Sequence, residues 1–106
     1  MSQSGPTLPP DAVYSRQPDI VVRQIAGETL LVPVRGELAR LDRIFALNSL
    51  GEFIWVALDG KAAIAEVCSS VTAAFDVDES TAREDVIEFV SDLEDAGLVS
   101  LSARRG

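Results

Sequence analysis

The sequence contains no histidine and only one cysteine, Cys68. A single cysteine cannot form an internal disulfide, and without histidine the usual zinc sites and histidine-based acid or base catalysis are excluded. No apolar run approaches the roughly 18 residues that a membrane span needs, and the first 18 residues lack the basic and then apolar pattern of a signal peptide. These absences favour a cytoplasmic protein without a metal, a cofactor or a catalytic centre of its own.

The composition is otherwise that of an ordinary folded protein. The chain has 106 residues and a mass of 11.3 kDa, with 47% hydrophobic and 25% charged residues. These proportions are typical of globular proteins, and the length suits one domain with a single core.

The charge is strongly negative and concentrated in one stretch. The formal net charge is −8, and nine of the acidic residues lie between Asp76 and Asp95, where Arg83 is the only basic residue. Such a field repels phosphate groups, so nucleic acids and anionic membrane surfaces are poor candidate partners, whereas a neutral or basic partner is favoured. Acidic residues also solubilise exposed helices, and this simpler explanation stays open.

The first half of the chain predicts a proline-rich arm followed by short strands. Residues 1–18 hold four of the five prolines and show no apolar periodicity, so we expect a disordered arm there. Residues 20–25 and 29–34 are rich in β-branched and apolar residues and are joined by a short glycine-containing connection, which predicts a hairpin. A third short strand is expected at 43–47, leading directly into a helix.

Two helices are expected after this strand. The first begins at Asn48 or Ser49, either of which can cap it, and stops at 59–60, where an aspartate precedes a glycine. The second covers an apolar stripe at helical spacing over 64–75. Cys68 lies on this stripe and is therefore expected to be a small core residue rather than a nucleophile.

A third helix is expected from the residue after Asp78, with Ser80 or Thr81 as other cap candidates, to Ala96. Gly97 follows as a left-handed stop. Beside the main apolar stripe of this helix lie two further apolar residues, Ile87 and Val90. They indicate either a wider core contact or a partly exposed apolar groove beside the helix.

The order of elements predicts an α+β domain of the winged helix-turn-helix kind, with an N-terminal three-stranded antiparallel sheet followed by three helices. The domain is expected to cover residues 19–101, with 102–106 as a C-terminal tail. A helix-turn-helix protein contacts DNA with several Arg, Lys, Asn and Gln residues, but the second helix has none of these and the third has only Arg83, so the geometry is expected without DNA binding.

Several separated motifs resemble one known family. The segments Ile44–Trp55 and Leu58–Gly60 are similar to the signature "LN-x-x-G-x-x-I-W … L-D-G" of pyrroloquinoline quinone biosynthesis protein D, PqqD. The later segments Phe75–Asp78, Arg83–Leu93 and Gly97–Val99 are similar to the closing pattern of that family, "Y-D-V-D … D-V-x-x-F-L-x-x-L … G-L-I". Such domains occur free or fused to enzymes that modify ribosomally made peptides.

The resemblance implies a non-catalytic peptide-recognition domain, called a RiPP recognition element. It implies that the leader of a precursor peptide binds as an added strand on the third strand, packs against the third helix and is presented to a modifying enzyme such as a radical-SAM enzyme, a protease or a cyclase. Carried over to this sequence, the peptide-binding cleft is lined by Arg43, Ile44, Phe45, Ala46, Arg83, Ile87, Val90 and Glu94. The acidic third helix adds the hypothesis that the leader carries Lys or Arg next to an apolar anchor.

Two other functions stay open at this stage. One is a PqqD-like structural or regulatory subunit of an enzyme that uses no leader peptide. The other is an acyl or peptidyl carrier protein, because Asn48-Ser49-Leu50 faintly resembles a phosphopantetheine attachment site. The carrier alternative is disfavoured because strand-forming residues, and not a helix, precede Ser49.

Overall fold

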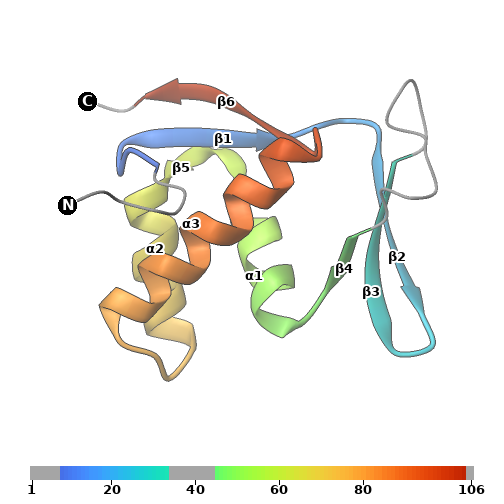
Figure 1. Ribbon diagram of the computed structural model, residues 1–106, viewed down its shortest axis with the longest axis horizontal. Helices are drawn as coiled ribbons and strands as arrows, with labels where there is room; N and C mark the ends of the chain where they lie inside the picture. The colour runs from blue at the N-terminus through green and yellow to red at the C-terminus, as the bar shows by residue number, and fades with distance from the viewer. Residues whose placement is uncertain (1–7, 34–44, 105–106) are drawn as a thin grey trace.

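The computed structural model describes residues 8–33 and 45–104. Within these residues the chain forms strands and helices in the following order: β1 (Ala12–Arg16), β2 (Ile20–Ile25), β3 (Glu28–Pro33), β4 (Phe45–Leu47), α1 (Ser49–Ala57), β5 (Asp59–Ala63), α2 (Ile64–Ala74), α3 (Glu79–Asp95) and β6 (Val99–Arg104). Figure 1 shows the helices grouped between two separate sheets.

The strands form two antiparallel sheets. The predicted hairpin and third strand make one sheet in the order β2-β3-β4, with Val22 opposite Leu31 and Leu31 opposite Phe45. The other sheet has the order β5-β1-β6. The α+β class, with a three-stranded antiparallel sheet and three helices, is thus confirmed. The winged-helix arrangement is compatible with this order of elements and stays a prediction.

The prediction that residues 1–18 form a disordered arm is wrong for its second half. Residues Ala12–Arg16 form β1, the central strand of the second sheet, and Ala12, Val13 and Tyr14 are buried. Pro10 and Pro18 do not interrupt this strand; they flank it, where the missing N–H groups cost no ladder hydrogen bond. The expectation of disorder at 1–7 falls outside the described residues.

The C-terminal boundary also differs from the prediction. The strand β6 extends through residues 102–104, which were expected in the tail, and pairs with β1 so that Arg104 lies opposite Ala12. The two strands β5 and β6 were not predicted as strands. Both are short and depend on β1 for their pairing, so the domain includes the segment from residue 12 onwards.

The three helices begin where the sequence predicts. Asn48 caps α1, because its side-chain Oδ1 accepts a hydrogen bond of 2.8 Å from the Gly51 N–H. Asp78 caps α3 in the same way, accepting from the Thr81 N–H at 2.8 Å, and these bonds lower the pKa of Asp78. At the other end of α3, Gly97 has a φ of +80°, as its predicted role as a left-handed stop requires.

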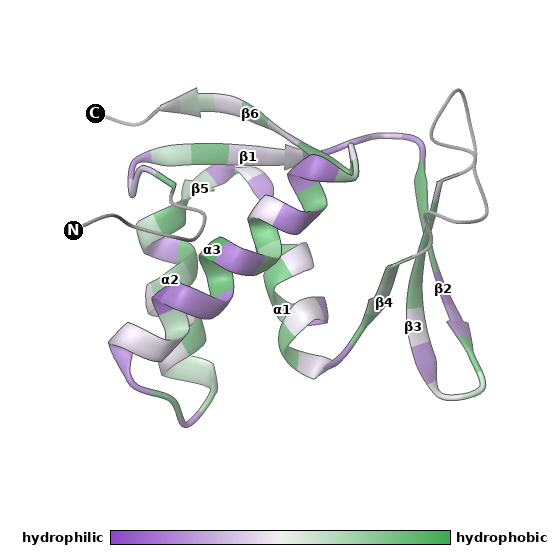
Figure 2. Cartoon of the chain, in the orientation of Figure 1, coloured by the Kyte–Doolittle hydropathy of each residue, from purple (hydrophilic) through white to green (hydrophobic). Residues whose placement is uncertain are grey.

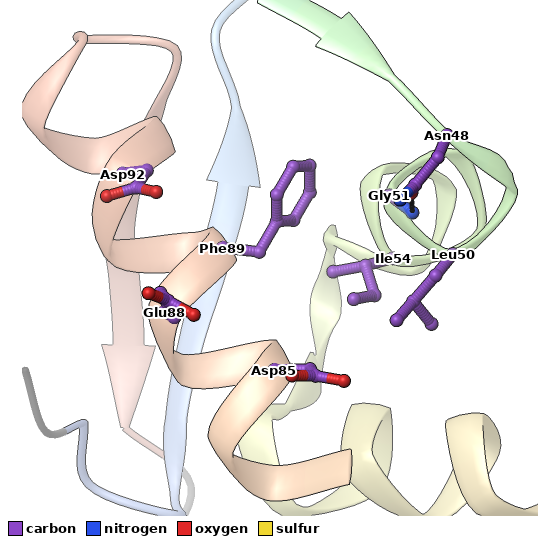
Figure 3. A pocket seen from close by; sticks show the side chains of 8 residues that line it. All are labelled: Asn48, Leu50, Gly51, Ile54, Asp85, Glu88, Phe89 and Asp92. Atoms are coloured by element: carbon purple, nitrogen blue, oxygen red, sulfur yellow. Dashed lines mark hydrogen bonds between the residues drawn. The ribbon is translucent and has the colours of Figure 1, made fainter. Parts of the chain in front are cut away.

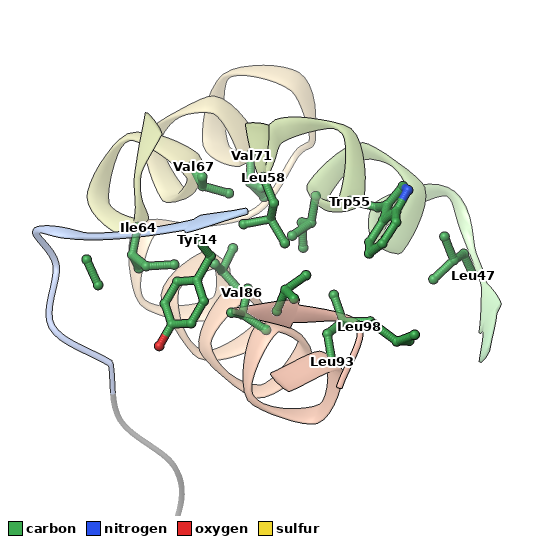
Figure 4. Close-up of a cluster of buried hydrophobic side chains, with 14 of the residues drawn as sticks. Tyr14, Leu47, Trp55, Leu58, Ile64, Val67, Val71, Val86, Leu93 and Leu98 are labelled. Carbon is green, nitrogen blue, oxygen red and sulfur yellow. The ribbon is translucent and has the colours of Figure 1, made fainter. Parts of the chain in front are cut away.

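The main core lies between the helices and the β5-β1-β6 sheet (Figure 4). Its fully buried side chains come from the three helices, from the residues that follow α1 and α3, and from β3 and β6: Leu31, Ile54, Leu58, Val67, Val71, Val86, Val90, Leu93, Leu98 and Val99. Cys68 packs partly buried against this cluster, and burial raises the pKa of its thiol. A raised thiol pKa disfavours the reactive thiolate, which agrees with the predicted role of Cys68 as a core residue.

None of the helices in the described part of the chain is both long and apolar enough to span a bilayer.

Candidate functional site

The strand β4 lies at the edge of its sheet. It pairs with β3 through Phe45, Ala46 and Leu47, and no other described strand pairs with its second side. Figure 1 shows β4 on the side of the hairpin that is nearer to α1. An edge strand exposes unpaired main-chain N–H and C=O groups, which are a template for one more strand. The structure therefore provides an acceptor edge next to the helices.

A short polar network fixes this sheet to the start of α1. Only Asn48 separates β4 from α1. The Thr29 hydroxyl on β3 donates a 3.1 Å hydrogen bond to Glu52 Oε2 in the first turn of α1. The Gln24 amide on β2 donates to Thr29 Oγ1 at 3.2 Å and reaches Glu52 Oε2 at 3.5 Å. Because Thr29 is only 7% exposed, the network holds the sheet in one orientation against the helix.

A pocket of about 270 Å³ lies between the beginning of α1 and the middle of α3 (Figure 3). It is lined by Asn48, Leu50, Gly51, Ile54, Asp85, Glu88, Phe89 and Asp92. Figure 3 shows the Phe89 ring extending from α3 into the space in front of the α1 N-terminus. The pocket thus combines an apolar surface with three carboxylates, and it opens beside the point where β4 ends.

Gly51 shapes this pocket because it has no side chain. A Cβ atom at this position would lie 3.3 Å from the Phe89 Cζ atom and 3.3 Å from Asn48 Oδ1, closer than most carbon contacts. The absence of a side chain therefore lets Phe89 approach the first turn of α1. Gly51, the glycine of the motif that resembles the PqqD signature, therefore has a packing role.

The structure places the predicted cleft residues in different surroundings. On β4, Phe45 is half-buried and Ala46 is exposed, while Arg43 and Ile44 lie outside the described residues. Val90 on α3 is fully buried in the core. The prediction that Val90 lines an open cleft is therefore wrong, and its side chain supplies the wider core contact that was the alternative.

The other predicted residues of α3, namely Arg83, Ile87 and Glu94, do not face the pocket. The positive charge of Arg83 acts on Cys68 of α2, where it opposes the effect of burial on the thiol pKa. The carboxylate of Glu94 lies within hydrogen-bonding range of the Tyr14 hydroxyl on β1, and burial together with this carboxylate raises the pKa of Tyr14. Figure 4 shows this hydroxyl pointing away from the core cluster. This face of α3 is therefore directed towards α2 and β1.

The pocket uses a different face of α3. Asp85, Glu88, Phe89 and Asp92 follow one another at i, i+3, i+4 and i+7, so they share one face of the helix. The sequence analysis treated these acids as a solvated surface or as a general attraction for a basic leader, and it did not place them in a pocket. An aromatic residue surrounded by acids at helical spacing was the available signal, because a purely solvated face has no need of Phe89. Figure 2 shows how much of the outer side of α3 is hydrophilic.

No group of three or more His, Cys, Asp or Glu side chains among residues 8–33 and 45–104 is arranged to hold a metal ion.

Comparisons with known structures define the class of fold. A structure of TbiB1 in complex with the TbiA(beta) leader peptide matches with a TM-score of 0.65 and 22% identity, over 87% of this chain and 99% of that one. A lasso peptide synthetase B1 complexed with the leader peptide matches with a TM-score of 0.66 and 22% identity, over 82% of this chain and 96% of that one. At this identity the likeness shows a shared fold, that of a small α+β domain.

The sequence itself identifies the family. The family model described as coenzyme PQQ synthesis protein D (PqqD) matches residues 28–99, a range that includes β3, β4 and all three helices. The chain belongs to the PqqD family. A comparison with curated proteins found no match to the chain.

Proposed function

We propose that this chain is a non-catalytic peptide-binding protein, a RiPP recognition element that binds the leader of a ribosomally made precursor peptide as an added strand on β4. The observation that carries the proposal is the unpaired edge of β4 beside the pocket between α1 and α3. Two proteins of the same fold are described as complexes with leader peptides, which supports the same role here.

The geometry suits an extended peptide. Main-chain hydrogen bonds from an edge strand supply affinity with little demand on sequence, and side chains at alternate positions of the added strand point to one face. On the face turned towards the helices, a side chain of the peptide meets the pocket formed by α1 and α3. Strand addition thus provides general affinity, and the pocket provides selectivity.

The chain contributes no chemistry of its own in this proposal. Its task is to raise the local concentration of the precursor at a modifying enzyme, because a tethered substrate reacts as if it were present at high concentration. The partner enzyme is a radical-SAM enzyme, a protease or a cyclase, and the two proteins meet in the cytoplasm. The acyl-carrier alternative does not fit, since a carrier needs a helix before Ser49 and β4 occupies that place.

The test is a backbone amide NMR titration with the leader half of a candidate precursor peptide. We expect shifts at β4 and along the pocket face of α3 from Asp85 to Asp92, with saturation at micromolar peptide. The face of α3 that holds Arg83 and Glu94 serves as an internal control and should shift much less. No shifts at millimolar peptide would refute leader binding for that precursor and favour a structural or regulatory subunit instead.

A second set of peptides tests the mode of binding. Methylating one main-chain nitrogen of the peptide at a time removes one N–H donor without changing a side chain. Because only alternate residues of a strand bond to the neighbouring strand, we expect binding to be lost at every second position and kept at the positions between. A uniform effect at all positions would contradict strand addition while leaving peptide binding intact.

A further inference from the structure

The pocket between α1 and α3 carries negative charge that no basic side chain in its lining compensates. Its lining includes the carboxylates of Asp85, Glu88 and Asp92 and contains no basic residue. In the part of the chain that the structure describes, no lysine or arginine forms an ion pair with these three side chains. A favourable field comes from the α1 N-terminus, which contributes about half a positive charge, and the Asn48 cap already uses part of it. The pocket is therefore net negative.

The same pocket has an apolar surface. The Phe89 ring lies close to Gly51 of α1, Leu50 and Ile54 also line the pocket, and the carboxylates lie along α3 (Figure 3). Phe89 and Asp85 are half-buried, whereas Glu88 and Asp92 are exposed. An apolar interior with acids at its outer margin matches a side chain that has an aliphatic stem and a cationic end.

We propose that this pocket selects a lysine or arginine side chain of the strand that binds to β4. This inference rests on the proposed function and specifies the peptide it takes. The stem of the side chain packs against Leu50, Ile54 and Phe89, and its charged end pairs with Asp85, Glu88 and Asp92. The position of the charge over the Phe89 ring adds a cation–π attraction.

The charge of the pocket favours a cationic side chain over an apolar or aromatic one. Leucine or tyrosine would fill the apolar surface equally well. Such a side chain would displace water from around the three carboxylates and would offer them no cationic partner. A buried or half-buried carboxylate that loses water without gaining a cation raises the cost of binding. A cationic side chain avoids this cost, so the pocket favours it over a neutral one of similar size.

The experiment is a selection from a displayed library of random 12-residue peptides, with three proteins as targets. One is the unchanged chain. The pocket variant carries Asp85→Asn, Glu88→Gln and Asp92→Asn. The control variant carries Asp76→Asn, Glu84→Gln and Asp95→Asn, three exposed acids near or on the same helix that do not line the pocket. Both variants change the net charge by the same amount, and thermal unfolding verifies that both remain folded.

We expect lysine or arginine to be enriched at one position of the peptides that bind the unchanged chain and the control variant, and not for the pocket variant. If peptides are recovered without such enrichment, or if the pocket variant keeps it, the pocket does not select a cation, although peptide binding stands. If the unchanged chain recovers no peptide, the proposed function itself fails, and this inference fails with it.

A selected peptide then gives the strength of the effect. Replacing its cationic residue by norleucine removes the charge and keeps the stem, and we expect affinity for the unchanged chain to fall about tenfold, as three partly exposed charge contacts allow. The same replacement should change affinity for the pocket variant by less than about twofold, since the partners are already gone. If both proteins lose affinity equally, the cationic residue of the peptide binds outside the pocket. Amide shifts at Gly51 and Phe89 report whether the peptide occupies the pocket.

Discussion

Replacing Val90 by alanine distinguishes a core residue from a groove residue. The Val90 side chain is 0% exposed and belongs to the cluster that contains Val86 and Leu93. Removing two buried methyl groups costs about 0.8 kcal/mol for each. The space left behind, on the order of 40 Å³, adds about 1 kcal/mol at roughly 24 cal/mol per Å³ if it does not collapse. We therefore expect Val90→Ala to lower the free energy of unfolding by about 2 to 3 kcal/mol.

The assay is urea unfolding followed by tryptophan fluorescence. Trp55 is the only tryptophan and is 4% exposed, so its emission reports loss of the core. A loss of this size lowers the midpoint of thermal unfolding by about 10 to 20 °C in a domain of this length. The variant still folds at 25 °C if the chain has the usual stability of about 5 to 15 kcal/mol.

The affinity of the folded variant for a peptide should be unchanged, because the methyl groups do not reach the pocket. Ile87→Ala is the matched control on the same helix: its side chain is only half-buried, so a smaller loss per methyl group is expected. A loss below about 0.5 kcal/mol for Val90→Ala, together with weaker peptide binding, would refute the core assignment and restore Val90 to a cleft.

Three further substitutions test the local structure, each by thermal or urea unfolding. Gly97→Ala should lower the free energy of unfolding by about 1 kcal/mol, because the φ of +80° is unfavourable for alanine, and an unchanged midpoint would contradict the left-handed stop. Asp78→Ala should lower the unfolding midpoint at neutral pH. The pKa of Asp78 is lowered in the fold, so the stability that its carboxylate contributes is present above the ordinary aspartate pKa and is lost as the pH falls through the lowered value. The unfolding midpoints of the two proteins should therefore become equal in acid. A difference that does not change with pH would be evidence against the cap. Tyr14→Phe should lower the free energy of unfolding by at most about 1 kcal/mol, because solvent weakens the interaction of the Tyr14 hydroxyl with Glu94 at the edge of the core. The pKa of Tyr14 is raised, so the stability that its hydroxyl provides is present below pH 10, near the ordinary tyrosine pKa, and is lost above it; the phenylalanine variant should lack this alkaline loss.

Local patterns were sufficient to predict the helices and the hairpin. Asn48, Asp78 and Gly97 are signals that depend on a few neighbouring residues, and each acts in the structure as the sequence indicated. The strand β1 escaped prediction for the opposite reason. Its five residues have no alternation, and its stability comes from β5 and β6, which lie about 45 and 85 residues further along the chain. Pairing over such distances leaves no local pattern.

The candidate site was only partly predictable for a geometric reason. The edge strand at Phe45 and Ala46 follows from the order of elements. The choice of face on α3 does not, because apolar residues occupy a wide arc of this helix, and the sequence does not tell which side meets α1 and which meets α2. The sequence predicted that the cleft lies on the side of Ile87 and Val90, because these apolar residues lie outside the main stripe. In the structure, the pocket lies on the side of Phe89. A hydrophobic stripe indicates burial, and only tertiary structure decides against which partner.

The pairing of Ala12 with Arg104 brings the beginning of β1 and the end of β6 side by side. Figure 1 shows this end of the second sheet on the opposite side of the helices from the β2-β3-β4 sheet. A short linker between the two positions would close the chain into a ring without disturbing either sheet, and the ring could be reopened at the exposed turn of Ala26 and Gly27 to give a circular permutant of the same fold. Joined to a larger polypeptide through this end, the domain would leave the edge of β4 open to solvent.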